Sequence, residues 1–334
     1  MRVLAWDGDI LYVSLGYELL RAQITQEQIV WQVVGRYVPS WLRSLSSRFT
    51  LSSRLLRDGF HALAVLSSGD IVAAIPGQII RLAPGQSEFQ AVHRIVRGSR
   101  PLHFAVSAGD RIYWGEYFDN RQRDEVHIYA STDRGRSWNV AYTFARGAIR
   151  HVHNVVYDRW ADCLWVLTGD EDAECRLLRA SCDFKTVETA LSGTQQTRAA
   201  ALIPAAEGIY FSSDTPVEAN YVYRLDRRGR LSRLAGLSSS SIYGCRVGPD
   251  LFFSTMVEPS SANSDCHARV YGASDDCNWQ SLLEWKKDKW PMGLFQYGNV
   301  IFPNGENRSG ILALTSVAVT PGDQETSLWR VEHQ

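Results

Sequence analysis

The sequence lacks an excess of charge of one sign, and it lacks long apolar runs. Its 35 Lys and Arg side chains are balanced by 36 Asp and Glu, so the formal net charge of the 334 residues is −1. This balance argues against a general nucleic-acid or membrane-surface binder. No stretch approaches the roughly 18 to 20 apolar residues of a membrane span, and the opening MRVLAWDGDILYVSLG is not typical of a signal peptide. We therefore expect a partner that is neither nucleic acid nor a membrane.

Paired cysteines are also lacking. The chain has six cysteines, and none forms a C-x-x-C pair. In a long chain without an apparent leader, this usage predicts reduced thiols and a cytoplasmic location. A secreted protein whose leader has been removed is the alternative.

Helical patterns are scarce, and SWLRSLSSRF (residues 40–49) is the one short candidate. What recurs instead is a hairpin of two apolar strands around a tight turn rich in Gly, Asp or Asn. The turns lie near Asp9, Asp70, Asp110, Asp162, Gly208, Asp250 and Asn299. Their mean spacing of roughly 48 residues matches a four-stranded propeller blade. We predict an all-β chain: one seven-bladed β-propeller over residues 1–334, with four-stranded antiparallel blades. A six-bladed propeller, or a β-sandwich with a second β domain, is the alternative.

One turn, STDRGRSW, falls between the third and fourth strands of its blade. It fits the pattern Ser-x-Asp-x-Gly-x-Ser-Trp with Ser131, Asp133, Gly135, Ser137 and Trp138. The Asp carboxylate is suited to accept backbone N–H groups across the turn, and Gly is suited to its left-handed position. The motif therefore predicts a structural turn rather than a catalytic loop. Degenerate copies retain Ser181, Asp183 and Thr186; Ser274, Asp275 and Trp279; and Asp226 with Gly229.

The motif resembles the Asp box, or BNR repeat, of sialidase-like propellers. The resemblance implies a propeller and a preference for carbohydrate. Those enzymes usually have six blades and an Arg-Ile-Pro signature near the start, which this chain lacks. We therefore do not carry over sialic acid as the substrate.

In a propeller, the loops that enter the first strand and leave the second surround one channel mouth. The side chains predicted at the start of the first strands are His61, His103, His153, Arg198 and Tyr243. Those predicted at the end of the second strands are Glu116, Tyr117, Asp170, Asp214 and Glu258. His151 alternates with His153 and is expected on the same strand face. The sequence thus predicts a pocket of imidazole, guanidinium, phenol and carboxylate groups.

Cleavage of an anionic polysaccharide by β-elimination suits this set. Arg198 would neutralise a uronate carboxylate, and His103 or His153 would accept the C5 proton. Tyr243 would then protonate the leaving oxygen. Propeller-type polysaccharide lyases resemble this set in kind, which is an analogy of fold and residue type.

Two other chemistries stay open. Glycoside hydrolysis would use a carboxylate pair drawn from Glu116, Asp170, Asp214 and Glu258, about 5 or about 6.5 to 9.5 Å apart. A divalent metal could bind His103 and His153 with one or two carboxylates. No organic cofactor is expected.

Binding without turnover is the further alternative. Trp114, Tyr117 and Trp160 would then stack on an acidic sugar. His61, His151, Asp214 and Glu258 would be polar contacts. Each of these residues also has a purely structural interpretation, and Arg198 could simply pair with Asp170 or Asp214.

Overall fold

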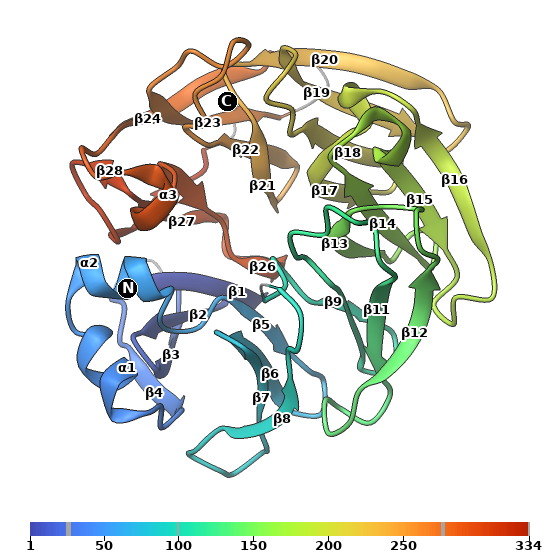
Figure 1. Ribbon diagram of the computed structural model, residues 1–334. Coiled ribbons are helices and arrows are strands. Elements are labelled where there is room, and N and C mark those ends of the chain that lie inside the picture. Colours follow the sequence, from blue (N-terminus) through green and yellow to red (C-terminus); the bar gives the residue numbers. More distant parts are fainter. Residues whose placement is uncertain (25–27, 99, 275–277, 333–334) are drawn as a thin grey trace.

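The computed structural model describes residues 1–24, 28–98, 100–274 and 278–332. Seven antiparallel sheets are arranged around a central axis, and the structure is a seven-bladed β-propeller (Figure 1). The predicted fold is confirmed, and the six-bladed alternative is wrong.

The first six blades follow the chain in order, each with its first strand innermost. Blade 1 contains β1 (Arg2–Gly8), β2 (Ile10–Leu15), β3 (Glu18–Gln23) and β4 (Gln32–Arg36). Blade 2 contains β5 (Ala62–Val65), β6 (Ile71–Ile75), β7 (Gln78–Leu82) and β8 (Gln90–Arg94). Blade 3 contains β9 (Ala105–Ser107), β10 (Arg111–Gly115), β11 (Val126–Ser131) and β12 (Asn139–Phe144).

Blade 4 contains β13 (His151–Asp158), β14 (Cys163–Gly169), β15 (Arg176–Ala180) and β16 (Val187–Ser192). Blade 5 contains β17 (Ala199–Ala205), β18 (Gly208–Ser213), β19 (Asn220–Asp226) and β20 (Leu231–Leu237). Blade 6 contains β21 (Ser241–Val247), β22 (Asp250–Thr255), β23 (His267–Ala273) and β24 (Gln280–Lys287), extended by β28 (Val319–Thr320). Two short 3-10 turns, η1 (Asp172–Glu174) and η2 (Gln195–Thr197), lie beside blade 4.

Blade 7 departs from the predicted pattern. It has three strands, β25 (Asn299–Ile301), β27 (Ile311–Val317) and β29 (Thr326–Arg330). The turn predicted at Asn299 is wrong, because Asn299 opens the inner strand and the second strand begins only at Ile311. The intervening β26 (Asn304–Asn307) leaves the blade and pairs in parallel with β1.

The ring is closed by contacts between blade 1 and blade 7. Besides the β1–β26 pairing, the Val3 amide donates to Thr315 Oγ1 at 2.9 Å, and Thr326 Oγ1 donates to the Met1 carbonyl at 2.8 Å. The first strand of the chain therefore stays in its own blade and is joined to the last blade along its edge.

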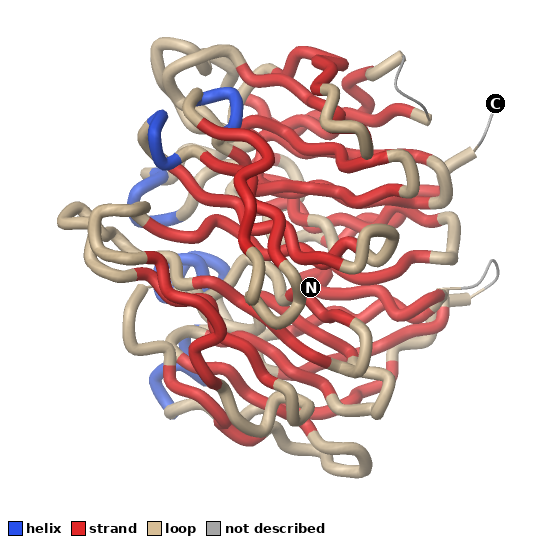
Figure 2. The backbone as a smooth tube through the Cα atoms, turned by 90° about the vertical axis from the view of Figure 1, so that its right-hand side faces the viewer, coloured by secondary structure: helices blue, strands red, loops and turns tan. Residues whose placement is uncertain are grey.

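Helices occur in two connections. The predicted helix near residues 40–49 is present as α1 (Trp41–Ser46), followed by α2 (Thr50–Leu56), and both lie between blades 1 and 2. A short α3 (Met292–Phe295) precedes blade 7. Figure 2 shows the helical segments at one face of the disc. Among the described residues, no helix has the length and apolar character needed to cross a membrane.

The buried core lies between neighbouring sheets. One cluster joins blades 3 and 4 through side chains such as Ile128, Val152 and Val166, all of which are almost fully buried. Similar clusters occupy the interfaces of blades 4 and 5 and of blades 5 and 6. Both faces of a blade must therefore be apolar, which explains the hydrophobic runs in the predicted strands.

The STDRGRSW turn joins β11 to β12, as predicted. Asp133 Oδ1 accepts from the amides of Arg136 and Ser137 at 3.1 and 2.9 Å, and Gly135 has a φ of 77°. The Trp138 ring stacks on Phe104 with a centroid distance of 6.1 Å. The turn is thus held by its own hydrogen bonds. In the degenerate copies, Asp183 and Asp226 also accept backbone amides, whereas Asp275 lies outside the described residues.

Candidate functional site

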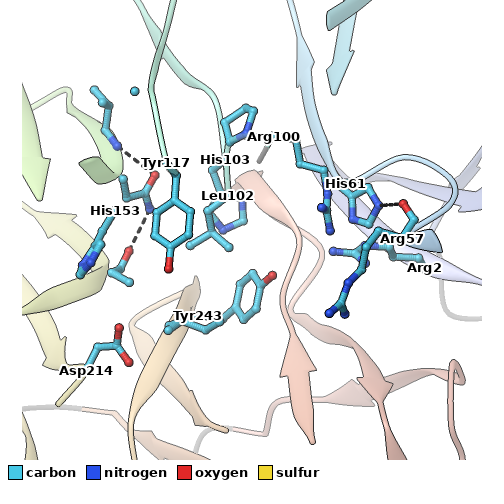
Figure 3. Close-up of a pocket in the computed structure, with 16 residues that line it drawn as sticks. Arg2, Arg57, His61, Arg100, Leu102, His103, Tyr117, His153, Asp214 and Tyr243 are labelled. Carbon is cyan, nitrogen blue, oxygen red and sulfur yellow. Dashed lines mark hydrogen bonds between the residues drawn. The ribbon is translucent and has the colours of Figure 1, made fainter. Parts of the chain in front are cut away.

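A cavity of about 310 Å³ lies at one mouth of the central channel. Its walls come from the beginnings of the inner strands and from the loops that precede them. Figure 3 shows the labelled side chains around it, with Arg2, Arg57, His61 and Arg100 on one side and His153 and Asp214 on the other. Tyr117 and Tyr243 lie between the two sides.

Bulges in the inner strands shape this wall. The pairing register shifts between Val152 and Asn154 in β13, which leaves His153 as the extra residue. The same kind of shift leaves Ala200 extra in β17 and Ile242 extra in β21. A bulge turns a side chain out of the regular alternation, and all three of these residues line the cavity.

Three arginines form what we call the arginine wall: Arg2, Arg57 and Arg100. Arg2 begins β1, Arg57 caps the C-terminus of α2 in a left-handed conformation, and Arg100 precedes β9. Burial, followed by the positive charges of Arg2 and Arg57, lowers the pKa of Arg100 to about 9. Within the described part of the chain, the buried Nε atoms of Arg2 and Arg100 have no hydrogen-bond partner. Like charges gathered in this way favour an anion between them.

Two histidines and a tyrosine face the arginine wall. The His61 Nε2–H donates to the Arg57 carbonyl at 2.7 Å, and burial followed by the charges of Arg100 and Arg2 places the His61 pKa well below its usual range. Burial, followed by the Arg2 charge, lowers the pKa of His103 to about 4. The His103 and Tyr243 rings meet edge to face at 5.7 Å, and the Tyr243 hydroxyl is hydrogen-bonded to Arg2. His103 is therefore neutral at pH 7 and lies beside a phenol.

The opposite side carries carboxylates. Asp214 lines the cavity, and burial raises its pKa to about 8; Arg198 opposes this rise, while Glu258 and Asp170 add to it. Glu258 accepts a hydrogen bond from Ser240 at 2.8 Å. The cavity thus has the arginine wall on one side and the Asp214 carboxyl on the other.

His151 and His153 face each other beside the acidic side. Their Nε2 atoms are 3.1 Å apart, and both lie near Asp170 Oδ1, at 3.5 and 3.4 Å. The Tyr117 ring packs on His151 with a centroid distance of 4.1 Å. The two histidines therefore do meet on one face, as their alternation suggested, although a bulge lies between them.

Several of the predicted residues lie away from the cavity wall. Arg198 binds Asp170 Oδ1 at 3.1 Å instead of facing the cavity, and Asp170 also pairs with Arg150. Glu116 is buried in an ion pair with Arg97 and accepts the His127 amide at 2.9 Å. Trp114 is buried against Tyr129 with ring centroids 4.7 Å apart. These contacts give Glu116 and Trp114 structural roles that strand packing explains.

The metal set considered from the sequence, His103 with His153, is not the set that the structure assembles. His103 faces Tyr243, and the donor atoms of His153 converge instead with those of His151 and Asp170. His151 and His153 are two positions apart in β13, and this spacing was the sequence signal that they share a face.

Sequence reasoning missed the arginine wall. Arg2 occupies the same position in blade 1 as His61 and His103 do in blades 2 and 3, so the repeat alignment itself could have revealed it. Arg57 and Arg100 lie in connections of unequal length, where no repeat position identifies them.

No family model matches this chain, and no curated protein matches it. Solved structures do match. A chain of the mitotic checkpoint complex matches with a TM-score of 0.58 and 8% identity, over 100% of this chain and 90% of that one. A chain of the nidogen–laminin complex matches with a TM-score of 0.53 and 12% identity, over 87% of this chain and 96% of that one. Regucalcin of Agrobacterium tumefaciens, described as a calcium-binding protein, matches with a TM-score of 0.50 and 12% identity, over 79% of this chain and 84% of that one. At these identities the likeness shows the propeller fold alone.

Proposed function

We propose that this propeller binds an anionic oligo- or polysaccharide in the cavity at the channel mouth, with its carboxylate against the arginine wall. The observation that carries the proposal is the presence of Arg2, Arg57 and Arg100 in one partly buried wall without a carboxylate among their hydrogen-bond and ion-pair partners in the described residues. Guanidinium groups bind carboxylates through paired, charge-assisted hydrogen bonds. The uncompensated charge favours an acidic sugar over a neutral one.

The same wall supports β-elimination as the reaction. A uronate carboxylate held by the arginines would be neutralised, which makes its C5 proton easier to remove. His103, neutral at pH 7, accepts that proton, the C4–O bond breaks, and a C4=C5 double bond forms. Tyr243 gives its hydroxyl proton to the leaving oxygen, so the step needs no further reactant. In this assignment Arg2 and its neighbours take the role that the sequence gave to Arg198, because Arg198 is bound to Asp170.

The test uses purified full-length protein with polygalacturonate and with neutral dextran as probes. Binding is measured by calorimetry, and elimination by the ultraviolet absorbance of the unsaturated uronate. We expect binding of polygalacturonate alone, weakened about 10- to 100-fold in Arg100→Gln, because a hydrogen bond to a charged group contributes about 1.5–3 kcal/mol. Arg94→Gln, on the exposed outer strand β8, is the matched control.

His103→Gln and Tyr243→Phe separate binding from chemistry. We expect both variants to bind polygalacturonate within a few-fold of the unaltered protein and to form no unsaturated product. Binding without product in the unaltered protein would leave the non-catalytic binding propeller. New reducing ends without the absorbance of an unsaturated uronate would indicate hydrolysis. The candidate catalytic residues would then be Asp214 and Glu258. If neither probe binds, or if Arg100→Gln binds as tightly as the control, the proposal is wrong.

A further inference from the structure

The orientation of two histidine rings is fixed by backbone carbonyls. His151 Nδ1 lies 3.1 Å from the Phe118 carbonyl, and His153 Nδ1 lies 3.0 Å from the Ala199 carbonyl. A carbonyl oxygen can only accept, so each Nδ1 carries the hydrogen. In the neutral rings each Nε2 therefore presents a lone pair, and the two lone pairs point into the same space.

Two facing lone pairs at 3.1 Å repel each other unless something positive lies between them. A single proton shared by the two rings would satisfy them, but Asp170 Oδ1 converges on the same space. Asp170 Oδ1 lies 3.5 Å from one Nε2 and 3.4 Å from the other, which is longer than an ordinary N–H···O hydrogen bond. These separations are instead those of two ligands bound to one ion.

The three donor atoms form a nearly equilateral triangle with sides of 3.1, 3.4 and 3.5 Å. Its circumscribed radius is about 1.9 Å, so an ion slightly above the plane lies about 2.1 Å from all three atoms, which is the bond length of Zn²⁺ to imidazole and carboxylate. We propose that His151, His153 and Asp170 bind one divalent transition-metal ion, with Zn²⁺ as the best match. Three protein ligands leave a fourth position for water or a ligand oxygen.

Neighbouring groups hold these ligands in place. Arg198 donates to Asp170 Oδ1 at 3.1 Å, and Arg150 donates to Asp170 Oδ2 at the same distance. The Phe118 and Ala199 carbonyls orient the two histidine rings in the same way. Each of the three ligands is therefore oriented by a second contact. Such outer contacts are typical of metal-binding histidines and carboxylates. Glu258 lies near Arg198 and offsets part of the added positive charge.

The ion would lie at the wall of the cavity. His153 lines the cavity, and Tyr117, which also lines it, covers His151. Metal at this wall would polarise an oxygen of a bound ligand opposite the arginine wall. This inference does not depend on the proposed saccharide, because its ligand atoms are separate from Arg2, Arg57 and Arg100.

The experiment measures metal binding by the full-length protein after chelator treatment and dialysis. Equilibrium dialysis against Zn²⁺ is expected to give one tightly held ion per chain. Co²⁺ in its place should give the intense visible absorption of a four-coordinate site with nitrogen and oxygen ligands. Zn²⁺ should also raise the melting temperature of the unaltered protein relative to chelator, a readout that does not depend on any variant folding.

His153→Gln and Asp170→Asn identify the ligands. Each is expected to weaken Zn²⁺ binding at least about tenfold and to remove the Co²⁺ absorption. His127→Gln, on strand β11 away from the group, is the matched control. Arg100→Gln should bind the ion normally while binding the saccharide more weakly. A protein that binds no stoichiometric Zn²⁺, Co²⁺, Mn²⁺ or Fe²⁺ overturns the proposal and leaves a shared proton between the rings. Binding that survives in both ligand variants overturns it as well.

Discussion

His61 and His103 face a wall of positive charge, and this should appear in the pH dependence of stability. Burial and the Arg2 charge lower the pKa of His103. Burial and the charges of Arg100, Arg2 and Arg57 lower the pKa of His61. In the folded protein the pKa of His103 is about 4, below the value of about 6.5 in an unfolded chain. Between these values only the unfolded state takes up the proton. The free energy of unfolding should therefore fall as the pH is lowered from about 6.5 to about 4.

Urea denaturation at several pH values measures this effect. His103→Gln should lose less stability than the unaltered protein over that range, whereas His127→Gln should follow the unaltered protein. If the free energy of unfolding changed with pH by the same amount in all three proteins, His103 would have the same pKa in the folded and unfolded states.

The candidate residues show where sequence reasoning reached its limit. His103, His153, Tyr243, Tyr117, Asp214 and His61 all line the cavity, because repeat alignment identifies positions that the propeller brings to one mouth. Which polar groups are already paired cannot be read from such an alignment. Arg198 is paired with Asp170, and Glu116 is paired with Arg97 across a connection.

Among the elements, the turn between β11 and β12 is self-contained. Besides the two backbone amides, Asp133 accepts the hydroxyl hydrogen bonds of Ser131 and Ser137 at 2.8 and 2.7 Å. Asp133→Ala should lower the free energy of unfolding by about 1–3 kcal/mol, because several donors lose their acceptor. Ligand and metal binding should be unchanged, since the turn does not contribute to the cavity.

Asp183→Ala in the corresponding turn of blade 4 is the comparison for that experiment. Asp183 accepts one backbone amide, one hydroxyl and the exposed Lys185 ammonium, whose ion pair contributes little at the surface, so its loss should cost less. If Asp133→Ala instead abolished binding with stability intact, a structural role for the turn would be ruled out.

Strand pairing was predictable where a blade repeats and unpredictable where it does not. Period-2 alternation identified the first six blades because their buried faces are regular. Blade 7 was misjudged since β26 pairs with β1, an interaction between residues about 300 positions apart that leaves no local pattern. The bulge at His153 is likewise invisible locally, because it is defined by the partner strand.

For the molecule as a whole, Arg54 connects distant parts of the ring. Its side chain, 1% exposed, runs from α2 to Asp288 at 2.5 Å and Asp323 at 2.9 Å, and it also donates to the Phe295 carbonyl. Arg54→Met should lower the free energy of unfolding by about 3–5 kcal/mol, because Asp323 loses its cation and Asp288 keeps only Lys287. The melting temperature measures this, with the exposed Arg48→Met as control. Equal melting temperatures for Arg54→Met and the unaltered protein would show that this ion pair does not hold α2 to the segments around Asp288 and Asp323.

Each of blades 1 to 6 contributes to the lining of the cavity, through Arg2, His61, His103, His153, Asp214 and Tyr243 among others. A ligand that touches this set spans six sheets at once, so no sheet can detach without breaking part of the complex. A free ligand concentration of 100 times the dissociation constant would add about 2.7 kcal/mol to the free energy of unfolding of the entire ring. Protease would then cut the loops between all six blades more slowly, and a library of compounds can be screened for that protection without any assumption about the reaction.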